Sequence, residues 1–257
     1  MIRIVFLLRR KSGMTLAEFQ RYWREQHGPL VAGVQKHIGA LRYTQSHRLE
    51  DPANAAMQEA RGGMEPEYDG VAELWWDSEE ALAATLGTDA GRKAGDALLE
   101  DEAKFIDLPQ SPLWLTHEYP QVNPTPENVV ARERSGIVKL HFPLRFKAGL
   151  DETAARTYWR TSHGPLIRSQ AHASGIIRYV QVHRYPSALE AQLRRTRGTV
   201  VPSYDGHAEV WFDRSISRAG PELRAAGQRA VEDEAKFIDF KRSTMWIGKE
   251  HVFIDRM

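Results

Sequence analysis

The chain has 257 residues, of which 42% are hydrophobic and 27% are charged, as in a globular protein rather than a disordered one. Its 35 basic and 34 acidic residues leave a net charge of +1, which argues against a dedicated nucleic-acid-binding protein. The sequence contains no cysteine, so disulfides, thiolate nucleophiles and iron–sulfur sites are excluded; this fits a reducing compartment, and we expect a cytoplasmic protein.

The first predicted element is a strand over residues 2–8, in which Ile2, Ile4, Phe6 and Leu8 share one face. This apolar run is far shorter than a membrane span, as is every other apolar run in the chain. It is followed by RRKSG rather than by a small-residue cleavage site. We therefore expect neither a membrane segment nor a signal peptide here.

A helix is predicted next, beginning at Thr15. Thr15 is followed three residues later by Glu18, which is the spacing of a capping box. An apolar stripe then continues through Leu16, Phe19, Trp23 and His27. The Gly28-Pro29 pair is expected to end or kink this helix, with Pro29 opening a second short one.

Two strands follow the helices. In ALRYTQSHRL, Tyr43, Gln45 and His47 fall on one face because strand side chains alternate. In GVAELWWD, one face is apolar, whereas the other carries Glu73 and Trp75 among its residues. Residues 78–105 have helical character, with an interruption near 87–89, and SPLWLTHEY closes the unit as a strand. The predicted order is β-α-β-β-α-β.

The whole pattern occurs twice. YWREQHGPL, which starts at Tyr22, recurs as YWRTSHGPL at Tyr158, 136 positions later. YDGVAELWWD recurs as YDGHAEVWFD with the same offset, and EDEAKFID recurs verbatim with an offset of 132. The second copy is therefore shorter by about one helical turn, and we place the loss between residues 214 and 231.

The two copies meet in a polar, proline-containing stretch. We assign residues 1–120 to the first repeat, 121–135 to a linker and 136–257 to the second repeat. Because each mixed sheet face needs a partner, two copies in one chain supply one another. We predict an α+β protein in which two ferredoxin-like repeats form an intramolecular, pseudo-dimeric α+β barrel with the helices outside; a further homodimer of whole chains remains open.

The repeated phrases point to a known family. RYWREQHGPL, LRYTQSHRL and YDGVAELWWD together resemble the EthD-domain family of the dimeric α+β barrel superfamily, and the second copy fits equally. That superfamily includes cofactor-independent cyclases, lactone isomerases, decarboxylases, oxygenases and haem enzymes, and the EthD group is named for a protein of ether degradation that resembles an accessory factor. The resemblance implies the fold more strongly than the reaction.

His27 and His163 are the first candidates for catalysis, because imidazole exchanges protons near neutral pH. The alternative is that each histidine caps the C-terminus of its helix through the helix dipole. Tyr43 and Tyr179, on the second strand of each repeat, are candidates for orienting or protonating a substrate oxygen.

Glu73 and Glu209 form the third candidate pair. A carboxylate between apolar neighbours in a strand is costly unless it is paired or solvated. One interpretation is a general base with a raised pKa. The other, which we favour, is an ion pair with Arg42 or Arg178 across the sheet or the barrel.

Eight further side chains are candidates for binding the substrate: Trp23, Trp159, Trp75, Trp211, Tyr68, Tyr204, His141 and His207. The histidines at 141 and 207 replace Val5 and Val71 of the first copy, and strand parity puts them on the face of Glu209. A His/His/Glu metal site would use these three, but no compact ligand spacing supports it. We expect no metal and no cofactor.

The predicted function is that of a cofactor-independent acid/base enzyme of the lyase or isomerase type. Its substrate is expected to be an aromatic or lactone-like small molecule of a catabolic or secondary-metabolite pathway. The alternative is a non-catalytic accessory or small-ligand-binding protein of a degradation pathway. Phosphate-binding and nucleophile-elbow motifs are absent, which argues against nucleotide-dependent enzymes and serine hydrolases.

Overall fold

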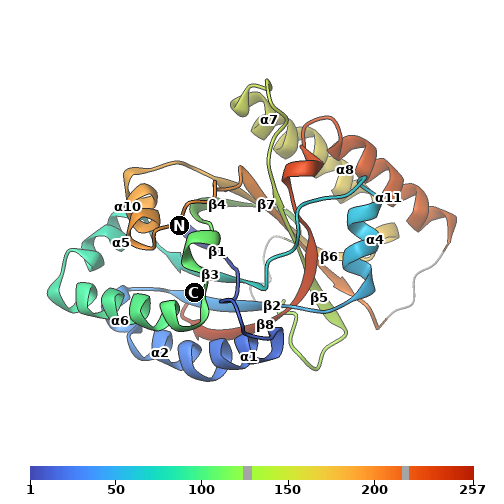
Figure 1. Ribbon diagram of the computed structural model, residues 1–257. Coiled ribbons are helices and arrows are strands. Elements are labelled where there is room, and N and C mark those ends of the chain that lie inside the picture. Colours follow the sequence, from blue (N-terminus) through green and yellow to red (C-terminus); the bar gives the residue numbers. More distant parts are fainter. Residues whose placement is uncertain (124–128, 216–219) are drawn as a thin grey trace.

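The computed structural model describes residues 1–123, 129–215 and 220–257. Eight strands form one closed antiparallel barrel in the order β1-β3-β2-β8-β5-β7-β6-β4 (Figure 1). The strands of the first half are β1 (Ile2–Leu8), β2 (Arg42–Arg48), β3 (Gly70–Trp76) and β4 (Leu113–Val122). Those of the second half are β5 (Ile137–Leu144), β6 (Ile176–Arg184), β7 (Gly206–Asp213) and β8 (Trp246–Asp255).

Each half contributes four adjacent strands, and the halves are joined at two seams. At one seam β2 pairs with β8, and at the other β4 pairs with β6. The prediction of an α+β barrel is confirmed, but the two sheets do more than face one another. They share backbone hydrogen bonds at both edges, which satisfies strand edges that would otherwise be open.

The helices lie outside the barrel (Figure 1). The first half has α1 (Leu16–Tyr22), η1 (Trp23–His27), α2 (Gly28–Gly33), α3 (Gln35–Ile38), α4 (Pro52–Glu59), α5 (Glu79–Leu86), α6 (Asp89–Phe105) and η2 (Leu108–Gln110). The second half has α7 (Glu152–Tyr158), η3 (Trp159–His163), α8 (Gly164–Ser169), α9 (Ala171–Ser174), α10 (Ala188–Thr196), α11 (Pro221–Glu234) and η4 (Phe240–Arg242). None of the described helices is both long and apolar enough to cross a lipid bilayer.

The helix that carries His27 begins as predicted, with a complete capping box between Thr15 and Glu18. It does not end at Gly28-Pro29. Residues 23–27 form a π-helical turn, in which the Gly28 N–H donates to the Trp23 carbonyl, and α2 continues with proline in its first turn. The wider turn accommodates Pro29, which has no N–H to donate. Residues 159–163 repeat this arrangement.

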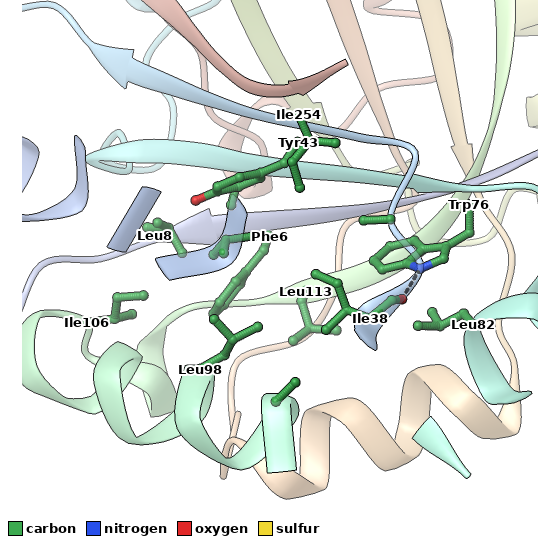
Figure 2. Packing of buried hydrophobic residues seen from close by; sticks show 14 of the residues in the cluster. Phe6, Leu8, Ile38, Tyr43, Trp76, Leu82, Leu98, Ile106, Leu113 and Ile254 are labelled. Atoms are coloured by element: carbon green, nitrogen blue, oxygen red, sulfur yellow. Dashed lines mark hydrogen bonds between the residues drawn. The ribbon is translucent and has the colours of Figure 1, made fainter. Parts of the chain in front are cut away.

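The two faces of the strands have the predicted parity. On β3, Ala72 and Trp76 lie in a cluster between the outer face of the first half's sheet and its helices. Figure 2 shows this cluster, in which the indole N–H of Trp76 donates to the Ile38 carbonyl at 2.8 Å. The inner face of the barrel instead carries Glu73, which is fully buried.

Each half sends one segment across to the other. The link between β2 and β3 contains α4, which lies beside α8 and α11 in Figure 1 and packs Met57 into the core of the second half. The link between β6 and β7 contains α10, which lies beside α5 and packs Leu189 into the core of the first half. We call these links the crossing arms, residues 49–64 and 185–200.

Candidate active sites between sheet and helices

Two cavities lie between the outer face of the barrel and the helices, one in each half. The first has a volume of about 280 Å³ and the second about 330 Å³. Six of the predicted site residues line them: Trp23, His27 and Tyr43 in the first cavity, and Trp159, His163 and Tyr179 in the second. The rest of both linings is mainly aliphatic and aromatic, as in sites for small apolar ligands.

The imidazole in each cavity is held by a carboxylate. His27 Nδ1 lies 2.9 Å from Asp101 Oδ2, and the other oxygen of Asp101 accepts the hydroxyl proton of Tyr22 at 2.7 Å. In the second cavity His163 Nδ1 lies 2.8 Å from Asp233 Oδ2. The partner of each histidine is thus a carboxylate side chain, whereas a helix cap would use backbone carbonyls.

The carboxylate sets the tautomer of the imidazole. Burial raises the pKa of Asp101, but hydrogen bonds from Tyr22 and His27 outweigh it and hold that pKa below its usual value. An ionised Asp101 accepts a hydrogen bond from the N–H at His27 Nδ1, so a neutral ring carries its lone pair on Nε2. His27 Nε2 makes no hydrogen bond to any residue that the structure describes, and it remains available to a ligand.

The hydroxyl group of the tyrosine in each cavity can donate a hydrogen bond. Tyr43 Oη accepts hydrogen bonds from Trp23 Nε1 at 3.1 Å and from Gln45 Nε2 at 2.9 Å. Both of these partners donate, so the hydroxyl proton of Tyr43 is left to donate in turn. Burial raises the pKa of Tyr43 well above its usual value, so the phenol keeps its proton. In the second cavity the equivalent side chains, Trp159 and Gln181, donate to Tyr179 Oη.

Gln45 and His47 support this arrangement. Gln45 Nε2 also donates to the Trp23 carbonyl at 2.8 Å, and Gln45 Oε1 lies 3.0 Å from His47 Nε2. The His47 ring stacks on Trp23, with centroids 4.6 Å apart and planes at 7°. The period-two set predicted on this strand therefore forms one network that orients Trp23 and Tyr43.

A crossing arm completes each cavity. Glu102 lines the first cavity and accepts two hydrogen bonds from Arg197, which follows α10 of the second half, at 2.8 and 2.9 Å. In the second cavity Glu234 accepts from Arg61, which follows α4 of the first half, at 2.8 and 3.0 Å. Each site therefore contains residues of both halves, which explains why two copies occur in one chain.

Sequence reasoning missed these charged residues, although a signal was present. Asp101 and Glu102 lie inside the verbatim repeat EDEAKFID, which we used only as a landmark. Arg61 and Arg197 are each followed by glycine, and the two Arg-Gly pairs are separated by the offset of the other landmarks. Charged residues that recur with the repeat were the available indication of a shared site.

Glu73 and Glu209 do not line the histidine cavities. They lie inside the barrel, because residues 72 and 73 point to opposite faces of a strand. Their charge partners include Arg3 and Lys139, which sequence reasoning did not single out: Arg3 Nη2 lies 3.0 Å from Glu73 Oε1, and Lys139 Nζ lies 2.7 Å from Glu73 Oε2.

The two buried carboxylates differ in protonation. Burial and the charge of Glu209 raise the pKa of Glu73 to about 8. Burial also acts to raise the pKa of Glu209, but Arg3 and Lys139 outweigh it and hold that pKa well below its usual value. Glu209 therefore fits the ion-pair interpretation, through Arg3 and Lys139, whereas Glu73 has the raised pKa of the other interpretation.

Six candidates for substrate binding also lie away from the histidine cavities: Trp75, Trp211, Tyr68, Tyr204, His141 and His207. Trp75, Trp211, His141 and His207 point into the barrel by the same alternation along their strands, and Tyr68 and Tyr204, which precede β3 and β7, pack in the interior cluster. Trp75 and Trp211 border a polar cavity of about 600 Å³ at the mouth of the barrel, beneath the guanidinium groups of Arg42 and Arg178. Tyr68 packs against Trp246 in the interior.

The histidines of the second copy share the face of Glu209, as predicted. His141 Nδ1 lies 3.0 Å from His207 Nε2, and His207 Nδ1 lies 3.6 Å from Glu209 Oε1. Burial lowers the pKa of both imidazoles, so both are neutral. This interior cluster is separate from the two lateral cavities.

Comparison with known proteins identifies the family of the chain. Residues 11–109 and 147–241 match the family model described as the EthD domain. The conidial pigment biosynthesis dehydratase EthD of Metarhizium robertsii is 30% identical over 113 residues, which cover 42% of this chain and 79% of that protein.

Two solved structures align over most of the chain. A putative monooxygenase from Lactobacillus acidophilus NCFM aligns over 99% of this chain and 96% of its own, with a TM-score of 0.47 and 9% identity. A putative chlorite dismutase aligns over 97% of this chain and 94% of its own, with a TM-score of 0.49 and 11% identity. Likenesses of this strength add nothing to the fold described above.

Proposed function

This chain belongs to the EthD domain family, and we propose that it is a lyase that removes water from a small aromatic or otherwise apolar molecule without a cofactor. The name of its relative from Metarhizium robertsii, a dehydratase of pigment biosynthesis, supports this reaction class. The observation that carries the proposal is the pairing of an oriented imidazole with a protonated tyrosine in one apolar cavity, repeated in both halves.

The cavity meets the needs of a dehydration. Such a reaction requires a base for a C–H proton, a donor for a developing oxyanion, and exclusion of bulk water. His27 Nε2 is the base, and Asp101 stabilises the imidazolium that forms. Tyr43 supplies the donor, since two neighbours already occupy its oxygen as donors.

The chemistry balances for a β-hydroxy carbonyl compound. His27 Nε2 takes the proton from the carbon beside the carbonyl, and the electron pair of that bond forms an enolate. Tyr43 donates its hydroxyl proton as a hydrogen bond to the enolate oxygen. The enolate electrons then form the carbon–carbon double bond as the bond to the hydroxyl group breaks. The imidazolium gives its proton to the departing oxygen, so water leaves and His27 is neutral again.

A direct test uses the aldol adduct of benzaldehyde and acetone, an aromatic β-hydroxy ketone whose dehydration creates a conjugated, ultraviolet-absorbing enone. We expect His27→Asn to remove turnover in the first cavity and His163→Asn to remove it in the second. The double variant is expected to lose ~100-fold or more in kcat/KM. His37→Asn, at an exposed position on α3, is the matched control and keeps full turnover.

The alternative is a non-catalytic binding protein, which the mainly apolar lining of each cavity also favours. The same assay separates the two functions. Saturable binding of the adduct by wild-type protein without any enone would support the alternative. Full turnover in the double histidine variant would contradict the acid/base role.

We also interpret each half as a ferredoxin-like unit. The order of elements, β-α-β-β-α-β, and the strand order β4-β1-β3-β2 in the first half support this interpretation. The division into 1–120, 121–135 and 136–257 stays a prediction, because residues 124–128 lie outside the described part of the chain. A further pairing of whole chains is also a prediction, which sedimentation velocity tests.

A further inference from the structure

The interior cluster of the second copy has the donor set of a metal site. His141 on β5 and His207 and Glu209 on β7 each offer one ligand atom, and these three atoms lie within 4.8 Å of one another. All three side chains are fully buried. Two imidazoles and one carboxylate are a common ligand set for zinc and for related divalent transition metals.

A neighbouring side chain orients one imidazole for this purpose. Ser46 Oγ, on β2 of the first half, lies 2.6 Å from His141 Nε2, which leaves His141 Nδ1 directed at His207. Histidines that bind metals usually hold their second nitrogen in a hydrogen bond of this kind.

The other imidazole has an unused nitrogen. His207 Nδ1 is buried and has no hydrogen-bond partner within residues 1–123, 129–215 and 220–257. A buried polar atom without a partner costs about 1–3 kcal/mol. Some further interaction of this ring would explain why the cost is tolerated.

The surrounding charge also suits a divalent cation. The ion pairs beside the cluster join two cations, Arg3 and Lys139, to four carboxylates: Glu73, Glu118, Glu209 and Glu250. The carboxyl groups of this network outnumber its cations, so a bound divalent ion would meet an excess of acidic groups.

The two halves differ at these positions in a way that packing does not require. Val5 and Val71 occupy the equivalent sites of the first half, and both are fully buried in the same barrel interior. The fold therefore accepts valine at such positions. The presence of two buried imidazoles in the second half is therefore not explained by packing alone.

We propose that His141, His207 and Glu209 bind one divalent transition-metal ion inside the barrel, with zinc as the best match. In the structure, Glu209 is paired with Arg3 and Lys139. To bind the ion, one oxygen of the Glu209 carboxylate therefore has to leave these partners and turn toward the metal. The site is independent of the lyase activity proposed above, since it lies on the opposite face of the strands from both histidine cavities.

The test is a binding measurement on the full chain after dialysis against a chelator. Calorimetric titration with ZnCl₂ should give about one tight equivalent, and CoCl₂ should give the visible absorption of a four- or five-coordinate ion. The double variant His141→Val/His207→Val installs the side chains of the first half. It should lose this equivalent and the cobalt absorption while keeping the far-ultraviolet circular dichroism of the wild type.

A second variant keeps the test decisive if the double variant does not fold. Ser46→Ala leaves all three ligands in place and removes only the hydrogen bond to His141. It should weaken zinc binding by ~10- to 100-fold. Zinc or cobalt binding that is equal in wild type and variants, or absent from the wild type, would overturn the proposal.

Discussion

The cavities of the two halves contain equivalent hydrogen-bond networks, but different side chains form their walls. The histidine–aspartate distance is 2.9 Å in the first and 2.8 Å in the second, and the tryptophan–tyrosine distance is 3.1 Å in both. The wall residues Ile38, Trp76 and Leu98 of the first cavity have Ser174, Phe212 and Ala230 as their counterparts in the second. The comparison teaches that the two copies keep the same hydrogen bonds around histidine and tyrosine, whereas the shape of the cavity differs between them.

The largest effect is expected at the shared network. Trp23→Ala and Trp159→Ala each remove a fully buried indole that donates to a tyrosine and stacks on a histidine. Each variant should lose about 3–5 kcal/mol of unfolding free energy. Urea denaturation measures this loss. A clear difference between the two variants would mean that the two tryptophans do not stabilise their halves equally.

A smaller loss of stability is expected at the crossing arms. Arg197→Met keeps the aliphatic stem but leaves the carboxylate of Glu102 buried without its cation. Because Arg197 is partly exposed, we expect about 2 kcal/mol, less than for a deeply buried pair. Arg61→Met should match it through Glu234. Denaturation that is unchanged in both variants would show that these two ion pairs do not stabilise the fold.

The proton donor is expected to affect catalysis rather than folding. Tyr43→Phe removes the hydroxyl that faces the first cavity, and Tyr179→Phe removes its equivalent. In a background where the other cavity carries its histidine-to-asparagine change, each should lower kcat by ~10- to 100-fold. A change confined to KM would assign the tyrosines to binding instead.

The walls offer a sharper comparison. Ser174→Ile together with Ala230→Leu gives the second cavity two side chains of the first. We expect the larger of two aromatic β-hydroxy ketones to lose ~10-fold in kcat/KM relative to the smaller. Equal effects on both ketones would show that these walls do not select the ligand.

The smallest effect concerns acid stability. The pKa values of Asp101 and Asp233 are held below the usual 3.8, so each contributes stability above that pH. This contribution disappears as the pH falls through the lowered folded-state pKa. Asp101→Asn and Asp233→Asn should therefore flatten the loss of stability below about pH 4 to the same modest extent. Melting temperatures between pH 3 and 6 test this. If the two variants differed in how steeply their stability falls with pH, the two aspartates would not be equivalent.

Local pattern and repetition predicted much of this structure. The offset between the copies predicted two equivalent units, and strand parity put Glu73 on the mixed sheet face, which forms the barrel interior. Spacing along one strand also predicted the set that includes Gln45 and His47. These features depend on the period of a strand or helix, which neighbouring residues determine.

The rest depends on contacts between segments far apart in the chain. Arg197 reaches Glu102 only because α10 crosses to the other half, and nothing in the local sequence near either residue indicates this partner. Asp101 was overlooked for the same reason, since it meets His27 through the packing of α6 against the π-helical turn. The π-helical turn itself reflects a balance between proline geometry and tertiary packing that a Gly-Pro pair alone does not determine.

The central claim is that each cavity is one site built from both halves. It is tested most directly by turnover of two double variants, His27→Asn/Arg197→Met and His163→Asn/Arg197→Met. In the first, both changes fall in the first cavity, so we predict that the turnover of the second cavity survives. In the second, the changes fall in different cavities, so we predict that turnover is lost from the second cavity and lowered in the first, whose Glu102 has lost its cation. The opposite pattern, in which only the second variant stays active, would show that each half works alone and would contradict the account.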